Sequence, residues 1–126
     1  MKQEDKELLL KDLCARLPYK VKVTTTNAAV KFGVISGISI ENKISVRTKH
    51  ADIVFNCTEV KPYLLPLSSM TEEQKKEYHE LIRGMFSTNV LINYEVLTDF
   101  FNANHLDYRG LIHMGLAIDA TGLNIY

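Results

Sequence analysis

The chain has 126 residues, of which 46% are hydrophobic and 24% are charged, and its formal net charge at pH 7 is zero. These values are ordinary for one globular domain, which we place over residues 1–126, and they exclude disordered, collagen-like and disulfide-rich proteins. No apolar run approaches the roughly 20 residues of a membrane-spanning helix, and the acidic N-terminal segment does not resemble a signal peptide. We therefore expect a cytoplasmic protein with no membrane partner.

The first predicted element is an amphipathic helix over residues 3–17, which Pro18 ends. Its apolar stripe, with the spacing of one helical face, consists of Leu10, Leu13, Cys14 and Leu17. Asp12 and Arg16 form a favourable i,i+4 pair, which we place on the opposite, solvent-facing side. Cys14 and Cys57 are expected to be buried free thiols, because two distant cysteines form no metal motif.

Period-two alternation of apolar and polar residues, which is typical of strands, follows this helix. It occupies residues 19–24, 30–34, 38–48 and 51–57. We expect four or five short antiparallel strands that form a small barrel-like sheet. Gly33 and Gly37 predict a bulge or bend through which the barrel closes. The side chains expected to face inward are Ile38, Ile40, Ile44, Val46, Ile53, Phe55 and Cys57.

An extended connector with two prolines leads into three predicted C-terminal helices. These helices are expected over residues 71–84, 93–103 and 108–116. The first begins with a capping box at Thr71–Gln74 and ends at Gly84 and the polar residues 87–89. Asn93 and Asp107 are expected to cap the other two. The order of helix, strands and helices predicts an α+β domain.

Residues 100–120 gather several polar side chains in an apolar frame. A metal site is not expected there, because His105 and His113 do not share a helix face and zinc needs three or four converging ligands. No serine or cysteine lies in a glycine-flanked nucleophile elbow, and there is no phosphate-binding glycine loop. We therefore assign no catalytic residue and no cofactor, and favour a binding protein over an enzyme.

Arg109 is a lone basic residue in an acidic segment, next to Tyr108. Its guanidinium can form an ion pair with an acidic neighbour, or it can bind a phosphate or carboxylate beside the stacking ring of Tyr108. The acidic neighbours considered are Glu95, Asp99 and Asp107. Because Asn104 and His105 lie just upstream, these four residues, Asn104, His105, Tyr108 and Arg109, are candidate ligand-binding residues.

The charges are unevenly distributed along the chain. Residues 19–62 carry seven basic against three acidic side chains, whereas residues 67–126 carry four basic against eight acidic ones. Such an asymmetry favours an anionic ligand on the strands, with Arg47 and Lys49 as candidates, or a contact between copies in a homo-oligomer. Residues 94–116 have helix–turn–helix spacing but are net acidic, so we do not expect duplex DNA as a partner.

Three segments resemble a family of small uncharacterised proteins encoded by phages, prophages and mobile elements of gut bacteria. They are LLLKDLCARLPYKVKV, EVKPYLLPLSSMTEEQKKEY and FFNANHLDYRGLIHMGLAI, within which KPYLLPLSSMTEE and DYRGLI are the most specific. Family members carry a histidine near Asn104, and its absence here argues against histidine-based chemistry. The resemblance implies no established activity, but it implies a setting, that of a mobile-element accessory protein in a host cytoplasm.

Our leading hypothesis is a non-enzymatic counter-defence protein that sequesters a small anionic nucleotide signal, such as a cyclic nucleotide or an ADP-ribose derivative. A first alternative is a protein- or nucleic-acid-interaction module that uses the basic face of the strands. A second alternative is a small phosphodiesterase that uses His105 or His113.

Overall fold

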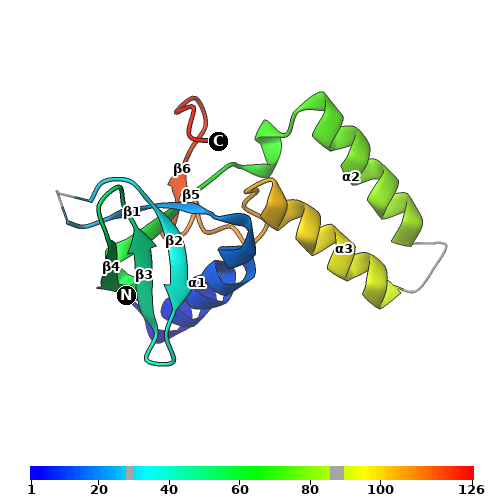
Figure 1. Cartoon of the computed structure of the whole chain (residues 1–126). Coiled ribbons are helices and arrows are strands. Elements are labelled where there is room, and N and C mark those ends of the chain that lie inside the picture. Colours follow the sequence, from blue (N-terminus) through cyan, green and yellow to red (C-terminus); the bar gives the residue numbers. More distant parts are fainter. Residues whose placement is uncertain (28–29, 86–89) are drawn as a thin grey trace.

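A computed structural model describes residues 1–27, 30–85 and 90–126 (Figure 1). The helices and strands run in the order α1 (Gln3–Arg16), β1 (Lys22–Thr25), β2 (Gly33–Ile38), β3 (Lys43–Arg47), β4 (Asp52–Asn56), β5 (Val60–Leu64), α2 (Glu72–Met85), α3 (Val90–Ala103) and β6 (Ile118–Asp119). This order confirms the α+β class. In the part of the chain described here, no helix has the length and apolarity to cross a membrane.

The strands form one mixed sheet in the order β4-β3-β2-β1-β5-β6. All neighbouring strands are antiparallel except β5 and β6, which are parallel. The predicted closed barrel is wrong, because β4 and β6 remain as two separate edges, and the sheet formed by the described residues has six strands rather than four or five. The sheet stays open because the chain leaves β5 for the helices and returns only as β6, on the side of β5 away from β1.

Two glycines shape β2 as the sequence suggests, although without closing the sheet. The register between β2 and β3 shifts between Ile35 and Gly37, which confirms a bulge. At Gly33 a Cβ atom would lie 2.5 Å from Cγ1 of Val46 on β3. Gly33 therefore permits a close approach of β2 to a buried side chain of its neighbour.

The main hydrophobic core lies between α1 and the inner face of the sheet. Of the side chains expected to face inward, Ile44, Val46, Phe55 and Cys57 belong to this core and Ile38 packs against it. Ile40 is an exception, because it lies in the turn between β2 and β3 and is fully exposed. Ile53 is also 37% exposed, since β4 is an edge strand.

Helix α1 presents a different face to the core from the predicted one. Its buried residues are Leu9, Asp12, Leu13 and Arg16. Leu10 is only partly buried and Cys14 is exposed, so the expectation of a buried thiol is wrong for Cys14 and correct for Cys57. The Asp12–Arg16 pair, expected on the solvent side, is fully buried.

Helices α2 and α3 lie side by side as a hairpin that extends away from the sheet (Figure 1). The capping box before α2 is confirmed: Gln74 N donates to Thr71 Oγ1 (3.1 Å), and Thr71 N donates to Gln74 Oε1 (2.9 Å). Helix α3 begins at Val90, so the predicted cap at Asn93 is wrong. The predicted helix-ending residues 87–89 lie outside the described residues.

The third predicted C-terminal helix is absent, and residues 108–116 form a series of turns. The Asp107 carboxylate does accept hydrogen bonds, from the N–H groups of Leu111 and Ile112, both at 2.9 Å. Gly110 and Gly115 adopt positive φ angles of 78° and 77°, which a right-handed helix does not allow. Asp107 therefore stabilises a turn instead of starting a helix.

Candidate functional site

The guanidinium of Arg109 binds another part of the same chain. Its Nε lies 3.1 Å from Oδ1 of Asp12 on α1, and its Nη2 donates to the Tyr108 hydroxyl at 2.9 Å. The guanidinium carbon also lies 4.8 Å from the centre of the Tyr108 ring. The ion pair is thus formed with Asp12, and not with one of the acidic residues considered from the sequence.

A second arginine completes this buried network. Arg16 Nε lies 2.8 Å from Oδ2 of Asp12, and Arg16 Nη2 donates to the carbonyl oxygen of Leu106 at 2.7 Å. The Tyr108 ring packs against this guanidinium and, with a centroid distance of 5.1 Å, against Phe101. Asp12 thus forms ion pairs with both Arg16 and Arg109, and the pair with Arg109 connects α1 to the segment that follows α3.

Asn104 and His105 also make contacts within the fold. Asn104 Oδ1 accepts from Gln74 Nε2 at 3.1 Å, which connects α3 to the start of α2. The His105 ring stacks on Tyr126, with centroids 3.6 Å apart and planes inclined by 11°. Burial, together with the nearby charges of Arg16 and Lys22, lowers the pKa of His105 to about 4, so the ring is neutral at pH 7.

The side chain of Tyr126 lies between β1 and β5 and forms hydrogen bonds to both strands. Its hydroxyl accepts from Lys22 N at 2.9 Å and donates to the Tyr63 carbonyl oxygen at 2.8 Å. The Lys22 ammonium lies 5.4 Å from the centre of the Tyr126 ring and 5.5 Å from that of Phe32. Burial raises the pKa of Tyr126 to about 12. The hydroxyl therefore bridges the two strands as a neutral group.

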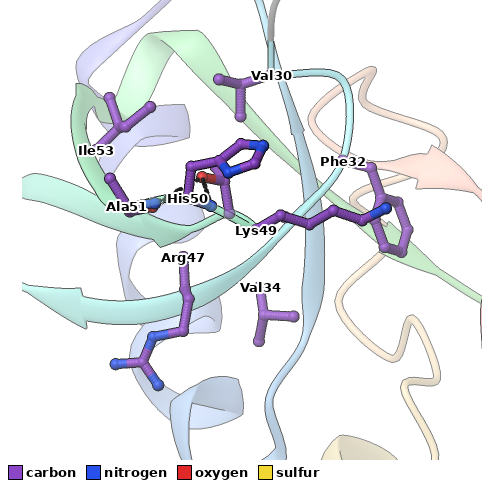
Figure 2. Close-up of a pocket in the computed structure, with 10 residues that line it drawn as sticks. Val30, Phe32, Val34, Arg47, Lys49, His50, Ala51 and Ile53 are labelled. Carbon is purple, nitrogen blue, oxygen red and sulfur yellow. Dashed lines mark hydrogen bonds between the residues drawn. The ribbon is translucent and has the colours of Figure 1, made fainter.

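A hollow of about 840 Å³ opens between the start of β2 and the turn that joins β3 to β4 (Figure 2). Apolar side chains form much of its lining, namely Val30, Phe32, Val34 and Ile53. Lys49 and His50 line it from the turn, where Thr48 Oγ1 accepts from the N–H groups of His50 (3.3 Å) and Ala51 (3.2 Å). These hydrogen bonds fix the backbone that carries Lys49 and His50.

Arg47 borders the same hollow, but its guanidinium points away from Lys49 and His50 (Figure 2). Its Nε lies 3.2 Å from Oδ1 of Asp52 in an exposed ion pair. Arg47 also borders a second, smaller hollow of about 400 Å³, together with Lys20. Arg47 and Lys49 therefore line the same hollow, but only Arg47 also borders the second one.

The candidate residues divide into two separate places. Residues 104–109 lie where α1, α3 and the following turns meet, and none of them lines the larger hollow. Sequence reasoning found Lys49 by its charge, but it missed His50 and Phe32. The signal for His50 was its place in a short polar turn between two predicted strands, which presents side chains on the surface.

Among the described residues, no group of three or more His, Cys, Asp or Glu side chains is placed to hold a metal ion. No protein-family model, curated protein or solved structure matches this chain.

Proposed function

We propose that this chain is a non-enzymatic binding protein for a small anionic ligand with a planar group, such as a cyclic nucleotide or an ADP-ribose derivative. The observation that carries the proposal is the hollow beside β2, with apolar walls and with the Lys49 ammonium and the His50 imidazole supplied by one turn. Its volume of about 840 Å³ lies within the range of about 300–1,000 Å³ that is usual for small-molecule sites.

The residues of the hollow suit the two ends of a nucleotide. Phe32 is 48% exposed, so its ring can stack against a base. Tyr63 supports that ring, with centroids 6.0 Å apart. Lys49 supplies a charged donor to a phosphate, and His50 adds an imidazole that can form a further hydrogen bond. The proposal places the ligand here and not at Arg109, whose guanidinium is already bonded to Asp12.

The resemblance to proteins of phages and mobile elements supports a biological role for such binding. We propose that the protein acts in a host cytoplasm, where it would remove a nucleotide signal from a defence system. Sequestration of this kind needs a binding site but no catalytic group.

Calorimetric titration with cyclic mono-, di- and trinucleotides and with ADP-ribose tests the proposal. We expect saturable binding of at least one of them, and a loss of affinity of about tenfold or more, about 1.4 kcal/mol, in Lys49→Ala. Phe32→Ala should weaken binding of ligands with a base. Lys76→Ala removes an exposed lysine of α2 and serves as the matched control. No binding by any of these compounds, or equal affinity in Lys49→Ala and the wild type, would refute the proposal.

A second candidate function is binding of single-stranded nucleic acid on the outer face of the sheet. The register places Lys22, Val34, Arg47 and Asp52 in one row across four strands, with Lys61 opposite Thr24. This face lies opposite the one that packs on α1. Affinity for an oligonucleotide should then fall steeply with salt, and each lysine or arginine removed should reduce the slope by about 0.7. The absence of a steep salt dependence, or a slope that these substitutions leave unchanged, would contradict this second candidate.

A further inference from the structure

The free edge of the sheet at β4 has the features of a pairing surface. Among the described strands, β4 pairs only with β3, and this register is continuous over all five residues. Val54 is 62% exposed and Ile53 is 37% exposed, although both are large apolar residues. Natural edge strands are usually protected by proline, bulges or lysine, and β4 (Asp52–Asn56) contains none of these.

The hydrogen-bond pattern shows which backbone groups of β4 point outward. Thr48 N donates to the Ala51 carbonyl oxygen at 2.9 Å, so these two residues form a hydrogen-bonded pair. Because such pairs alternate along an antiparallel ladder, Ile53 and Phe55 bond to β3 while Asp52, Val54 and Asn56 face away from it. Asn56 agrees with this pattern, since its N–H donates to the Glu59 side chain and not to β3.

We propose that β4 pairs in antiparallel fashion with β4 of a second copy of this chain, around a two-fold axis at Val54. This arrangement places Val54 opposite itself, and Asp52 opposite Asn56 of the second copy. The N–H groups of Asp52 and Val54 then donate to the carbonyl oxygens of Asn56 and Val54 of the other copy. Four backbone hydrogen bonds form in this way, without disturbing the bond from Asn56 to Glu59.

Under this symmetry, each apolar side chain of β4 lies opposite an apolar side chain of the second copy. On the inner face, Ile53 comes to lie opposite Phe55 of the second copy, so the two cores become continuous. Val54 meets Val54 on the outer face. An isologous contact of this kind buries the two exposed apolar side chains of β4 in both copies at once.

The charges at the edge support a second copy as the occupant. Within one copy, Arg47 pairs with Asp52, and the Lys43 ammonium donates to the Asn56 side chain. In the pair of copies, the Asp52 carboxylate lies between its own Arg47 and the Asn56–Lys43 pair of the other copy. No two like charges face each other across the axis, and Asp52 lies in one row with its own Arg47 and with the Asn56 and Lys43 of the second copy.

Light scattering during gel filtration tests the proposal. We expect a mass of twice 14.4 kDa for the wild type at micromolar concentration. Val54→Lys places two ammonium groups opposite each other and should reduce the mass to that of one chain, whereas Val54→Thr should retain the pair. Val96→Lys on α3 is the matched control, because Val96 is also exposed and apolar, and it should leave the mass unchanged.

A disulfide test locates the axis directly. In a Cys14→Ser background, Val54→Cys brings two thiols together at a Cα separation of about 5.5 Å, within the range of disulfides. Mild oxidation should then give a covalent dimer, whereas Val96→Cys in the same background should not.

Three outcomes would overturn the proposal: a wild type that stays at the mass of one chain, a dimer that Val54→Lys leaves intact, or cross-linking through position 96 instead of 54. Pairing through β4 does not depend on the proposed ligand site, and mass and cross-linking test it without any ligand. Val54 does not line the hollow and Val54→Lys keeps Lys49 and Phe32, but Ile53 belongs to both places. Ligand titration of this variant therefore shows whether the hollow of a single chain binds the ligand.

Discussion

Arg109 Nε lies 3.1 Å from Oδ1 of Asp12, although 97 positions separate the two residues in the sequence. The other carboxylate oxygen, Oδ2, lies 2.8 Å from Arg16 Nε. One carboxylate therefore balances two guanidiniums, of which Arg16 is fully buried and Arg109 is 18% exposed. Removing the carboxylate would leave a buried positive charge without its partner, which is far more costly than losing a surface ion pair.

The first prediction concerns this carboxylate. Asp12→Asn keeps the shape of the side chain but not its charge, and we expect it to lower the free energy of unfolding by about 3–5 kcal/mol. Urea denaturation measures this loss. The control is Arg47→Ala, which breaks the exposed pair with Asp52 and should cost less than about 1 kcal/mol. Equal losses in the two variants would contradict the role of Asp12.

The second prediction concerns the hydroxyl of Tyr126. Tyr126→Phe removes the group that connects Lys22 N to the Tyr63 carbonyl oxygen, so both backbone groups lose their partner. Because both hydrogen bonds are exposed, so that water can replace the hydroxyl, we expect a loss of about 0.5–1.5 kcal/mol in the free energy of unfolding. Tyr94→Phe removes the hydroxyl of an exposed tyrosine on α3 and should have little effect. The same denaturation measurement compares the two.

The third prediction is a dependence of stability on pH through His105. Its pKa is about 4 in the folded chain, against an ordinary value of 6.5. Between these values the unfolded chain binds a proton that the folded chain does not, so stability is full above pH 6.5 and falls as the pH falls towards 4. His105→Asn should reduce this slope, because asparagine has no titrating ring and tolerates the backbone φ of 58° at this position.

Urea denaturation at pH 7 and pH 4.5 measures the difference for the wild type and for each variant. His113→Asn is the control, since His113 is exposed, and it should leave the wild-type slope in place. A slope in His105→Asn as steep as that of the wild type would show that other groups cause the effect.

The fourth prediction concerns the close approach of β2 and β3. A Cβ atom at Gly33 would lie 2.5 Å from Cγ1 of Val46 and 3.0 Å from the carbonyl oxygen of Arg47. Gly33→Ala should therefore destabilise the protein by about 1–3 kcal/mol. Gly37→Ala is the matched control in the same strand, because its Cβ would meet only Ser45 Cβ at 3.9 Å. Thermal unfolding should show a clear loss for the first variant and a small one for the second.

Elements with local causes could be predicted from the sequence. The capping box at Thr71–Gln74 depends on residues three positions apart, and it forms as expected. The strands follow from alternation of apolar and polar residues, and the bulge beside Gly37 follows from a glycine within a strand. Each of these signals is complete within a few residues, so no knowledge of the rest of the chain is needed.

Features that depend on distant partners could not be predicted. Leu8, Leu9 and Leu10 are consecutive, so they allow more than one apolar stripe on α1, and the choice depends on Arg109 at the other end of the chain. The open sheet depends on β6, a strand of only two residues without a periodic pattern. For the candidate site, the sequence identified Lys49 but could not show that Phe32 lines the same hollow.

The two hydrophobic clusters suggest that the protein opens in two steps. Phe100, Phe101 and Leu106 form a cluster with α2 and α3, apart from the core between α1 and the sheet. The hairpin can therefore lose its packing while that larger core persists, as a cooperative unit of lower stability. Amide hydrogens of α2 should exchange with solvent faster than those of β1 and β3. The Asp12 ion pairs hold the segment after α3 to α1. We therefore expect them to determine the difference in exchange rate between α2 and these strands.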